Sequence, residues 1–336
     1  AAKQALAGRP SADWRPWVLD TIGTEVVLAN RITMGRGLDA PRFRWVSYAD
    51  PLLYPLETTI EAKTTPDREK LFPLEDALRQ RYLADLRLAA VPATLDAYLS
   101  QVVTPTLEAQ RKAGCLAIKF EVAYLRALDF GDVPQATAAR VYAAYARGGA
   151  PPHSDYKALQ DFLFRAVARE AGRLGMAVHI HSFEGVGSYY DTAGADPALL
   201  EPALNDPSLR ATPFVVIHGG GSRAGHTTGL LWKQNVYADI SLMTLTYAPS
   251  ELARVMRPWL TEFPEKVLFG SDASPVGPDL GWEVAAAAGT ANARTALGRA
   301  LTDMMRSGEV TSERARQIAT LVLRGNASRL YTLGLP

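Results

Sequence analysis

Short β-rich runs alternate with longer helical patterns along this chain, and that alternation restricts the possible folds more than any other feature. Apolar residues recur at helical spacing between the runs, most clearly over residues 155–174. A Ser/Thr cap signal opens the last helical segment, residues 311–333. Alternating strands and helices build a parallel sheet that is covered by helices. The runs expected to be strands are 25–29, 43–48, 116–121, 177–181, 214–218, 236–240 and 266–272.

Two architectures suit this alternation. An open doubly wound sheet would carry a Gly-rich G-x-G-x-x-G turn after an early strand, and the sequence has none. A (β/α)8 TIM-like barrel needs about 250 residues, which the chain exceeds. We therefore predict a single barrel domain over residues 1–336, with an excursion at 51–92 where prolines and a polar turn interrupt the pattern. Because only seven strands are expected, the first strand of the barrel is predicted to be absent from this chain.

Composition narrows the classes of function. Lys and Arg (36) nearly balance Asp and Glu (35), so the net charge of +1 gives no general field for nucleic acid or for an anionic membrane. No apolar run approaches the roughly 18 residues of a membrane helix. The single cysteine, Cys115, suits a reducing compartment, and we expect a cytoplasmic protein that acts on a small molecule. Assembly into a homo-oligomer stays open.

Ionisable residues stand at the ends of three predicted strands. The stretch "MAVHIHSFEG" ends an apolar run with His179 and His181, "FVVIHGGG" does so with His218, and "KVLFGSDASP" does so with Asp272. The carboxyl ends of barrel strands face the active site, and alternate residues share one face of a strand. Imidazole and carboxylate are suitable ligands for a divalent ion such as Zn²⁺. We predict that His181, His218 and Asp272 bind a metal, with His179 as a neighbour that supports the ligand or belongs to the core.

Other polar residues lie close to these strand ends. Lys119 and Glu121 end the strand at 116–121, and both are candidates for substrate binding. Lys119 is open to three roles, as an ion-pair partner of Glu121, a substrate anchor or, if carbamylated, a metal bridge. Arg126 could hold a substrate carboxylate with its bidentate fork or lie on the surface. His226 and Tyr189 are candidates for substrate contact, with surface or packing roles as the alternatives.

Several segments resemble, in order and spacing, one known family. The segments "HIHSFEGVGSYYD", "FVVIHGGG", "NVYADIS", "KVLFGSDASP" and "GNASRLYTL" are similar to the amidohydrolase superfamily, in the branch called amidohydrolase-related or amidohydrolase 2. The segment "AIKFEVAYLRALDF" is similar to the amidohydrolase half of glutamine-synthetase-like fusion proteins. The resemblance covers roughly residues 113–333.

The resemblance implies a distorted (β/α)8 barrel that binds one or two divalent metals, most often zinc. By position, His181 and His218 resemble the histidines of strands five and six, and Asp272 resembles the strand-eight aspartate that binds metal and shuttles a proton. Lys119 falls where some members carry a bridging carboxylated lysine. The family also has a His-x-His pair at the end of strand one, and no such pair precedes His153. We expect this pair and its strand to lie upstream of Ala1.

The resulting hypothesis is a hydrolase that uses a metal-activated water on an amide, lactone or ester-like bond. Asp272 would move the proton of that water, and His218 would bind the metal or stabilise the oxyanion. Two alternatives stay open, namely a metal-dependent decarboxylase on the same scaffold and a metal-free barrel with a binding or structural role.

Overall fold

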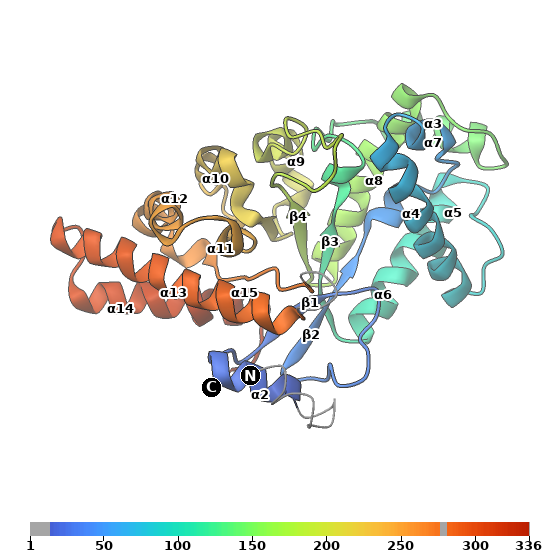
Figure 1. Cartoon of the computed structure of the whole chain (residues 1–336). Helices are drawn as coiled ribbons and strands as arrows, with labels where there is room; N and C mark the ends of the chain where they lie inside the picture. Colours follow the sequence, from blue (N-terminus) through green and yellow to red (C-terminus); the bar gives the residue numbers. More distant parts are fainter. Residues whose placement is uncertain (1–13, 276–280, 336) are drawn as a thin grey trace. The chain divides into compact units, whose positions relative to one another are not determined.

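The structure is a computed structural model that describes residues 14–275 and 281–335. Within these ranges it is a mostly parallel α/β fold (Figure 1), with seven strands whose order in the sheet follows the chain from β1 to β7. A strand overlaps each of the seven predicted runs, although only two residues of the run 266–272 are in a strand. The strands are β1 (Val27–Asn30), β2 (Phe43–Tyr48), β3 (Cys115–Phe120), β4 (Ala177–His181), β5 (Phe214–Ile217), β6 (Val236–Asp239) and β7 (Val267–Leu268).

The chain divides into two compact units. Unit 1 holds the described residues of 1–46 together with 240–326, and unit 2 holds 47–239 and the described residues of 327–336. The helices of unit 1 are α2 (Trp14–Ile22), α11 (Met243–Thr246), α12 (Pro249–Glu262), α13 (Trp282–Arg306) and α14 (Ser312–Thr320). The helices of unit 2 are α3 (Thr59–Ala62), α4 (Pro66–Asp85), α5 (Leu95–Tyr98), α6 (Thr104–Lys112), α7 (Gln135–Tyr145), α8 (His153–Arg173), α9 (Glu201–Leu204) and α10 (Ala224–Leu230); α15 (Asn326–Leu330) begins at the boundary.

The core of unit 2 is formed by strands that are buried on both faces. Every residue of β3, β4 and β5 is buried, as expected for parallel strands covered by helices. The register is parallel, with Lys119 beside His179 and His181 beside Ile217. Helices α6 and α8 pack against β3 and β4 respectively. This rigid layer fixes the positions of the side chains at the strand ends.

The long helix α8 confirms the prediction for residues 155–174. It buries a stripe of apolar side chains that includes Leu159, Leu163 and Val167, and it ends just before Gly175, whose φ is +67°. A left-handed residue after the last turn is common at helix ends and favours glycine.

The final predicted helix is divided in two. Thr311 Oγ1 accepts a hydrogen bond of 3.1 Å from Arg314 N at the start of α14, which confirms the predicted cap. A π-helical segment, Leu321–Gly325, then joins α14 to α15. A second π-helical segment, Leu99–Val103, joins α5 to α6.

The segment 51–92, which we predicted to be an excursion, belongs to unit 2. Its main helix, α4, begins at Pro66, because the Thr65 side chain caps it by accepting a hydrogen bond from Arg68 N, and the helix continues past Pro73 to Asp85. Helix α4 and helix α8 both pack on the short turn Asp50–Leu53 that follows β2.

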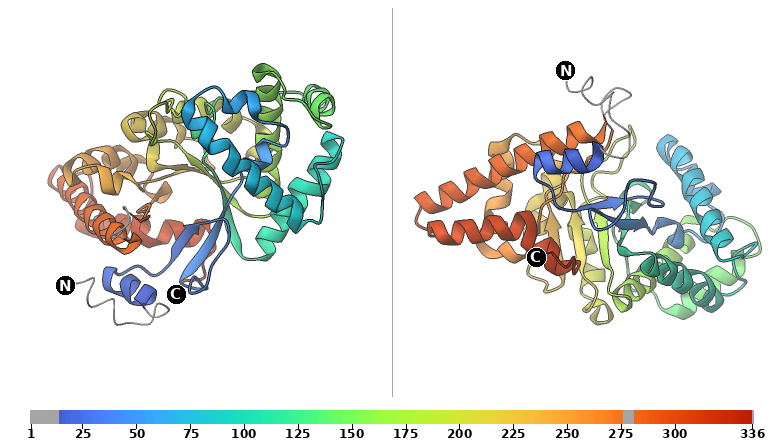
Figure 2. Two further views of the ribbon diagram at one scale, coloured as in Figure 1. Left: turned by 45° about the vertical axis from the view of Figure 1, so that its right-hand side comes forward. Right: turned by 90° about the horizontal axis from the view of Figure 1, so that it is seen from below.

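Unit 1 is mainly helical in its second half. Figure 2 shows α2 lying against α13, and the two helices meet through the rings of Trp14 and Trp282, whose centroids are 5.6 Å apart. Helix α13 also packs along α12 and α14. Within residues 14–275 and 281–335, no helix combines the length and the apolar character required to cross a bilayer.

Close helix packing in unit 2 predicts a position that is sensitive to one added methyl group. A Cβ atom at Gly172 of α8 would lie 3.0 Å from Thr212 Cβ and 3.2 Å from Thr212 Cα. Because backbone cannot move aside cheaply, Gly172→Ala should lower the free energy of unfolding by about 1–3 kcal/mol. The control is Gly298→Ala in α13, where a Cβ would meet nothing within 4 Å. That variant should gain about 1 kcal/mol from helix propensity. Urea titration measures both, and equal effects of the two substitutions would contradict the packing argument.

Candidate metal centre

Four of the predicted site residues lie together at the carboxyl ends of β3, β4 and β5. The parallel register sets Lys119 beside His179. Alternate residues of a strand point to the same side. Glu121, two residues after Lys119, therefore lies beside His181, two residues after His179. His218 directly follows β5, next to the end of β4. Lys119, Glu121, His181 and His218 therefore converge from three neighbouring strands of unit 2.

Glu121 links two of these groups. One carboxylate oxygen, Oε1, accepts from Lys119 Nζ at 2.5 Å, and the other, Oε2, lies 3.3 Å from His181 Nδ1. Burial alone would raise the pKa of Glu121, but the Lys119 ammonium and the His181 ring together hold the pKa well below its usual range. Glu121 is thus an anion that accepts from both neighbours.

His181 directs its other ring nitrogen into the protein. The residue is 2 % exposed, and Nε2 is buried with no hydrogen-bond partner among the described residues. When Nδ1 carries the proton that Glu121 accepts, Nε2 holds a lone pair. A buried, unpartnered nitrogen is costly unless something binds it. The centroid of the His218 ring is 4.9 Å from that of His181, and the Tyr124 ring is 4.8 Å away on another side.

A strained turn holds His218. Its φ is +65°, and three glycines with positive φ follow it. Asp239 at the end of β6 accepts a hydrogen bond of 2.7 Å from the His218 backbone N. A Cβ at Gly221 would lie 2.7 Å or less from the Phe183 ring, so glycine is required at that position. The glycines of "HGGG" therefore bend the chain sharply at His218.

His179 lies two residues before His181 on β4 and has a hydrogen-bond partner of its own. Its Nε2 lies 2.7 Å from the Tyr331 hydroxyl, which follows α15. Burial, followed by the nearby charge of Lys119, lowers the pKa of His179 to about 3. It is therefore a neutral ring at physiological pH, held in the core beneath the site, in keeping with its predicted supporting role.

These residues suit a divalent cation in part. Two buried imidazoles with one free lone pair at His181 Nε2 are appropriate donors for zinc. In the part of the chain that the structure describes, however, no three His, Cys, Asp or Glu side chains are grouped closely enough to hold a metal. Asp272 belongs to unit 1, where it is exposed after β7 with a φ of +53°. Its role as a metal ligand stays a prediction.

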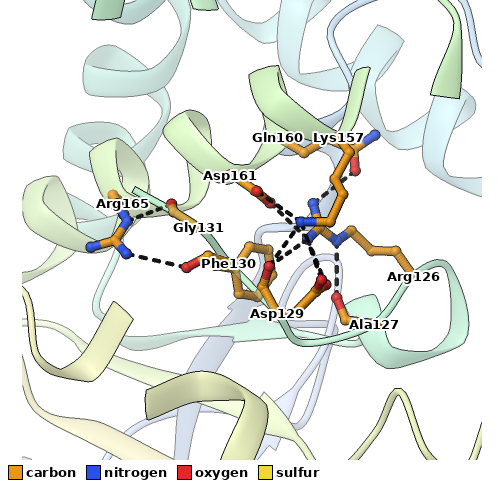
Figure 3. Close-up of polar contacts among 9 residues, drawn as sticks. All are labelled: Arg126, Ala127, Asp129, Phe130, Gly131, Lys157, Gln160, Asp161 and Arg165. Atoms are coloured by element: carbon orange, nitrogen blue, oxygen red, sulfur yellow. Dashed lines mark hydrogen bonds and ion pairs between the residues drawn. The ribbon is translucent and has the colours of Figure 1, made fainter. Parts of the chain in front are cut away.

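Arg126 lies in a buried ion-pair network (Figure 3). The side chain is 5 % exposed, and its guanidinium is 2.7 Å from Asp161 Oδ1 and donates to Gln160 Oε1 at 3.1 Å. It also stacks over the Phe130 ring at 4.5 Å, and Lys157 joins the network through Asp161 at 2.9 Å. The structure thus pairs Arg126 with residues of α8, and the N–H donors of its guanidinium stabilise the fold through these contacts.

The other two predicted substrate contacts lie on the surface of unit 2. His226 on α10 has a side chain that is 54 % exposed, and its Nδ1 is 2.8 Å from Asp196 Oδ1. Tyr189 is 58 % exposed, and its backbone N donates to Asp67 Oδ2 at 2.7 Å. The loop that carries Tyr189 also brings Tyr190 near His181, with 6.2 Å between ring centroids.

Two carboxyl groups near the site, those of Asp50 and Glu75, were not predicted from the sequence. Asp50 lies two residues after the end of β2, is 1 % exposed, and accepts a hydrogen bond of 3.0 Å from the Glu121 backbone N through Oδ2. Its Oδ1 and the Oε2 of Glu75 on α4 are buried without hydrogen-bond partners in the described ranges. Burial, with the charge of Glu75 next in importance, raises the pKa of Asp50 well above its usual range. Asp50 could have been found from its strand-end position, whereas Glu75 carried no such signal.

The acid group of Glu75 predicts a dependence of stability on pH. Burial first, and then Glu121 and Asp76, raise the pKa of Glu75 to about 7 in the folded protein. The unfolded chain releases this proton near pH 4.3, so the folded state binds more protons between about pH 4.3 and 7. Stability should therefore fall as pH rises through this window, by up to about 3 kcal/mol. Glu75→Gln should remove this loss, so the variant matches the parent at pH 4 and exceeds it at pH 8.

Urea midpoints at pH 4, 6 and 8 measure this difference. Glu69→Gln, which changes an exposed carboxylate on the same helix, is the control and should follow the parent at every pH. A difference between Glu75→Gln and the parent that is the same at pH 4 and pH 8 would contradict the assignment.

Comparisons with known proteins agree with the geometry of the fold. The structure is similar to that of a protein from Lactobacillus casei assigned as a metal-dependent hydrolase, with 17 % identity, a TM-score of 0.70, and coverage of 96 % of this chain and 77 % of that one. It is also similar to a uronate isomerase of Thermotoga maritima, with 14 % identity, a TM-score of 0.60, and coverage of 94 % and 69 %. A glucuronate isomerase of Caulobacter crescentus gives 12 % identity, a TM-score of 0.62, and coverage of 95 % and 66 %. At these identities, the likeness concerns the fold.

A search of curated protein sequences finds no match. The family model for amidohydrolases, in contrast, matches residues 118–333, which is more than half of the chain and includes Lys119, Glu121, His181, His218 and Asp272. This chain belongs to the amidohydrolase family.

Proposed function

We propose that this protein is a metal-dependent hydrolase that cleaves a C–N or C–O bond of a small molecule, such as an amide, a lactone or an ester. One observation carries the proposal: His181 Nε2 is buried and unpartnered while its Nδ1 faces the anion of Glu121. Metal-binding histidines commonly pair their second nitrogen with a carboxylate in this way. Family membership and the fold give further support.

The ligands of the proposed cation, most suitably zinc, are His181, His218 and Asp272. When bound, such an ion polarises a carbonyl and lowers the pKa of water toward about 7. His181 is oriented by Glu121, and Lys119 keeps Glu121 ionised through the contact of 2.5 Å. We therefore assign Lys119 to electrostatic support of Glu121 rather than to bridging metals.

Proton transfer is assigned to Asp272. Its carboxylate would accept a proton from the attacking water and return it to the leaving group. The alternative role for His218, in place of binding the metal, is to stabilise the negative charge that develops on the carbonyl oxygen. Tyr189 and His226, both exposed on unit 2, are the candidates for contact with the rest of the substrate.

We extend the proposal to the fold and to the cellular setting. Seven parallel strands in chain order and the family assignment support a full (β/α)8 barrel as the complete architecture. The single cysteine, Cys115, is buried and unpaired, in keeping with a reducing compartment such as the cytoplasm.

The reaction class can be tested with water labelled in its oxygen. A panel of amides, lactones and esters would be incubated with the zinc-loaded protein, and the products analysed by mass spectrometry. Hydrolysis places solvent oxygen in one product, whereas decarboxylation does not. The comparisons do not favour decarboxylation or a metal-free role, and the lone pair at His181 Nε2 argues against a metal-free role. Turnover without solvent oxygen in the product would contradict the proposal.

Substitution of Asp272 tests the proton carrier. Asp272→Asn keeps the size of the side chain and removes the basic oxygen, so turnover should fall by about 10²–10⁴-fold while the unfolding midpoint stays unchanged. Asp132→Asn, an exposed change elsewhere, should leave turnover intact. Undiminished turnover in Asp272→Asn would remove this residue from the mechanism.

Substitution of Glu121 tests the metal site without relying on activity. Glu121→Gln removes the anion that orients His181, so zinc affinity should fall by about 10–100-fold. Competition with a chromophoric chelator measures the affinity, and Glu108→Gln, at a carboxylate whose side chain is 51 % exposed, is the control. Equal affinities of Glu121→Gln and the parent would show that Glu121 does not support a metal ligand.

A further inference from the structure

Helices α12 and α13 of unit 1, whose course Figure 1 shows, have a groove between them that differs in chemistry from the site at the strand ends. The two helices pack against each other, and the groove along them has a volume of about 810 Å³. This volume lies within the range of about 300–1,000 Å³ that is usual for small-molecule sites. The lining residues are Ser250, Ala253, Arg254, Arg257, Arg294, Thr295, Gly298, Arg299, Ala300, Thr302, Asp303 and Arg306.

The groove concentrates positive charge. Among the described residues of the lining, five are arginines and only Asp303 is acidic, although the whole chain has a net charge of only +1. Arg254 and Arg299 are exposed, and neither has a hydrogen-bond or ion-pair partner within residues 14–275 and 281–335. Like charges gathered in one concave surface attract an anion and focus its approach.

The remaining arginines are held in place at the edges of the groove. Arg257 pairs with Glu309, and Arg294 donates to the backbone oxygen of Gly23 at 3.2 Å. Arg306 lies 3.8 Å from Asp303, which offsets part of its charge. A guanidinium has five N–H donors, so these contacts leave donors available on all three arginines.

The uncharged part of the lining favours a narrow, polar ligand. Small residues of the lining, among them Gly298, leave space in the groove, since even a Cβ at Gly298 would meet nothing within 4 Å. Ser250 and Thr302 add hydroxyl donors, whereas the Thr295 hydroxyl donates to Ala291 O of its own helix at 2.8 Å. Among the described residues of the lining there is no aromatic side chain, so a nucleic-acid base would have no ring there on which to stack.

We propose that the groove between α12 and α13 binds a small polyanion with several linked phosphate groups, through the guanidinium groups of Arg254 and Arg299. A guanidinium presents a planar fork of N–H donors that matches two phosphate oxygens at once. Such a chain of phosphates could come from inorganic polyphosphate or from a nucleoside triphosphate. This site is separate from the proposed metal centre in its residues and in its chemistry.

Calorimetric titration of the full chain with inorganic tripolyphosphate tests the proposal. Each lost charge-assisted contact should weaken binding by about tenfold, so Arg254→Gln/Arg299→Gln should bind about 100-fold more weakly. Arg254→Lys/Arg299→Lys keeps the charge but loses the fork, and it should give an intermediate affinity. The control is Arg140→Gln/Arg147→Gln, which removes two exposed arginines of unit 2. Equal weakening by the control and by the groove variant would overturn the proposal, because it would indicate a general charge effect.

Two further ligands identify the source of the phosphates. ATP that binds as tightly as tripolyphosphate supports recognition of the phosphate chain alone, and tighter binding of ATP supports a nucleotide. Binding of duplex DNA by the parent without binding of tripolyphosphate would overturn the proposal in favour of a nucleic-acid surface. Asp272→Asn should bind tripolyphosphate as the parent does, so failure of the hydrolase proposal and failure of this one can be distinguished.

Discussion

One carboxylate, that of Glu121, organises the chemistry at the strand ends of unit 2. One of its oxygens accepts a hydrogen bond from Lys119 Nζ, and the other lies 3.3 Å from His181 Nδ1. The parallel register makes this arrangement possible, because it sets β3 and β4 side by side with their alternate residues aligned. If the register shifted by one residue, Glu121 and His181 would point to opposite faces. The orientation of His181, the free lone pair at Nε2 and the proposed metal site all follow from this pairing.

Burial and neighbouring charges shift the pKa values of similar groups in opposite directions around this carboxylate. Glu121 stays ionised because two donors face it, whereas Asp50 and Glu75 receive less compensation and have raised pKa values. His179 stays neutral because it is buried near Lys119 and bonded to Tyr331. Such division of roles by environment is typical of catalytic sites. The raised pKa values also mean that ionisation of Asp50 and Glu75 lowers the stability of unit 2.

The sequence predicted the strands well because they are short, β-rich runs, of which β3, β4, β5 and β7 are buried throughout. Strand β1 is buried only in part. It also indicated His181 and His218, since position at a strand end can be read from the chain. Glu75 could not be found in this way, because its approach to Glu121 depends on how α4 folds back over unit 2. Arg126 illustrates the opposite case: its fork suited a substrate carboxylate, but Asp161 and Gln160 from α8 engage it. Long-range partners of this kind leave no local pattern in a sequence.

The central claim is that His181 Nε2 is a metal ligand. The most direct measurement is anomalous X-ray diffraction at the zinc edge, from crystals grown with zinc. The account predicts an anomalous peak about 2.0–2.1 Å from His181 Nε2, with the His218 ring also in the coordination sphere. A peak confined to another group, such as His226 and Asp196, or the absence of any peak beside His181 in crystals that contain zinc, would contradict it.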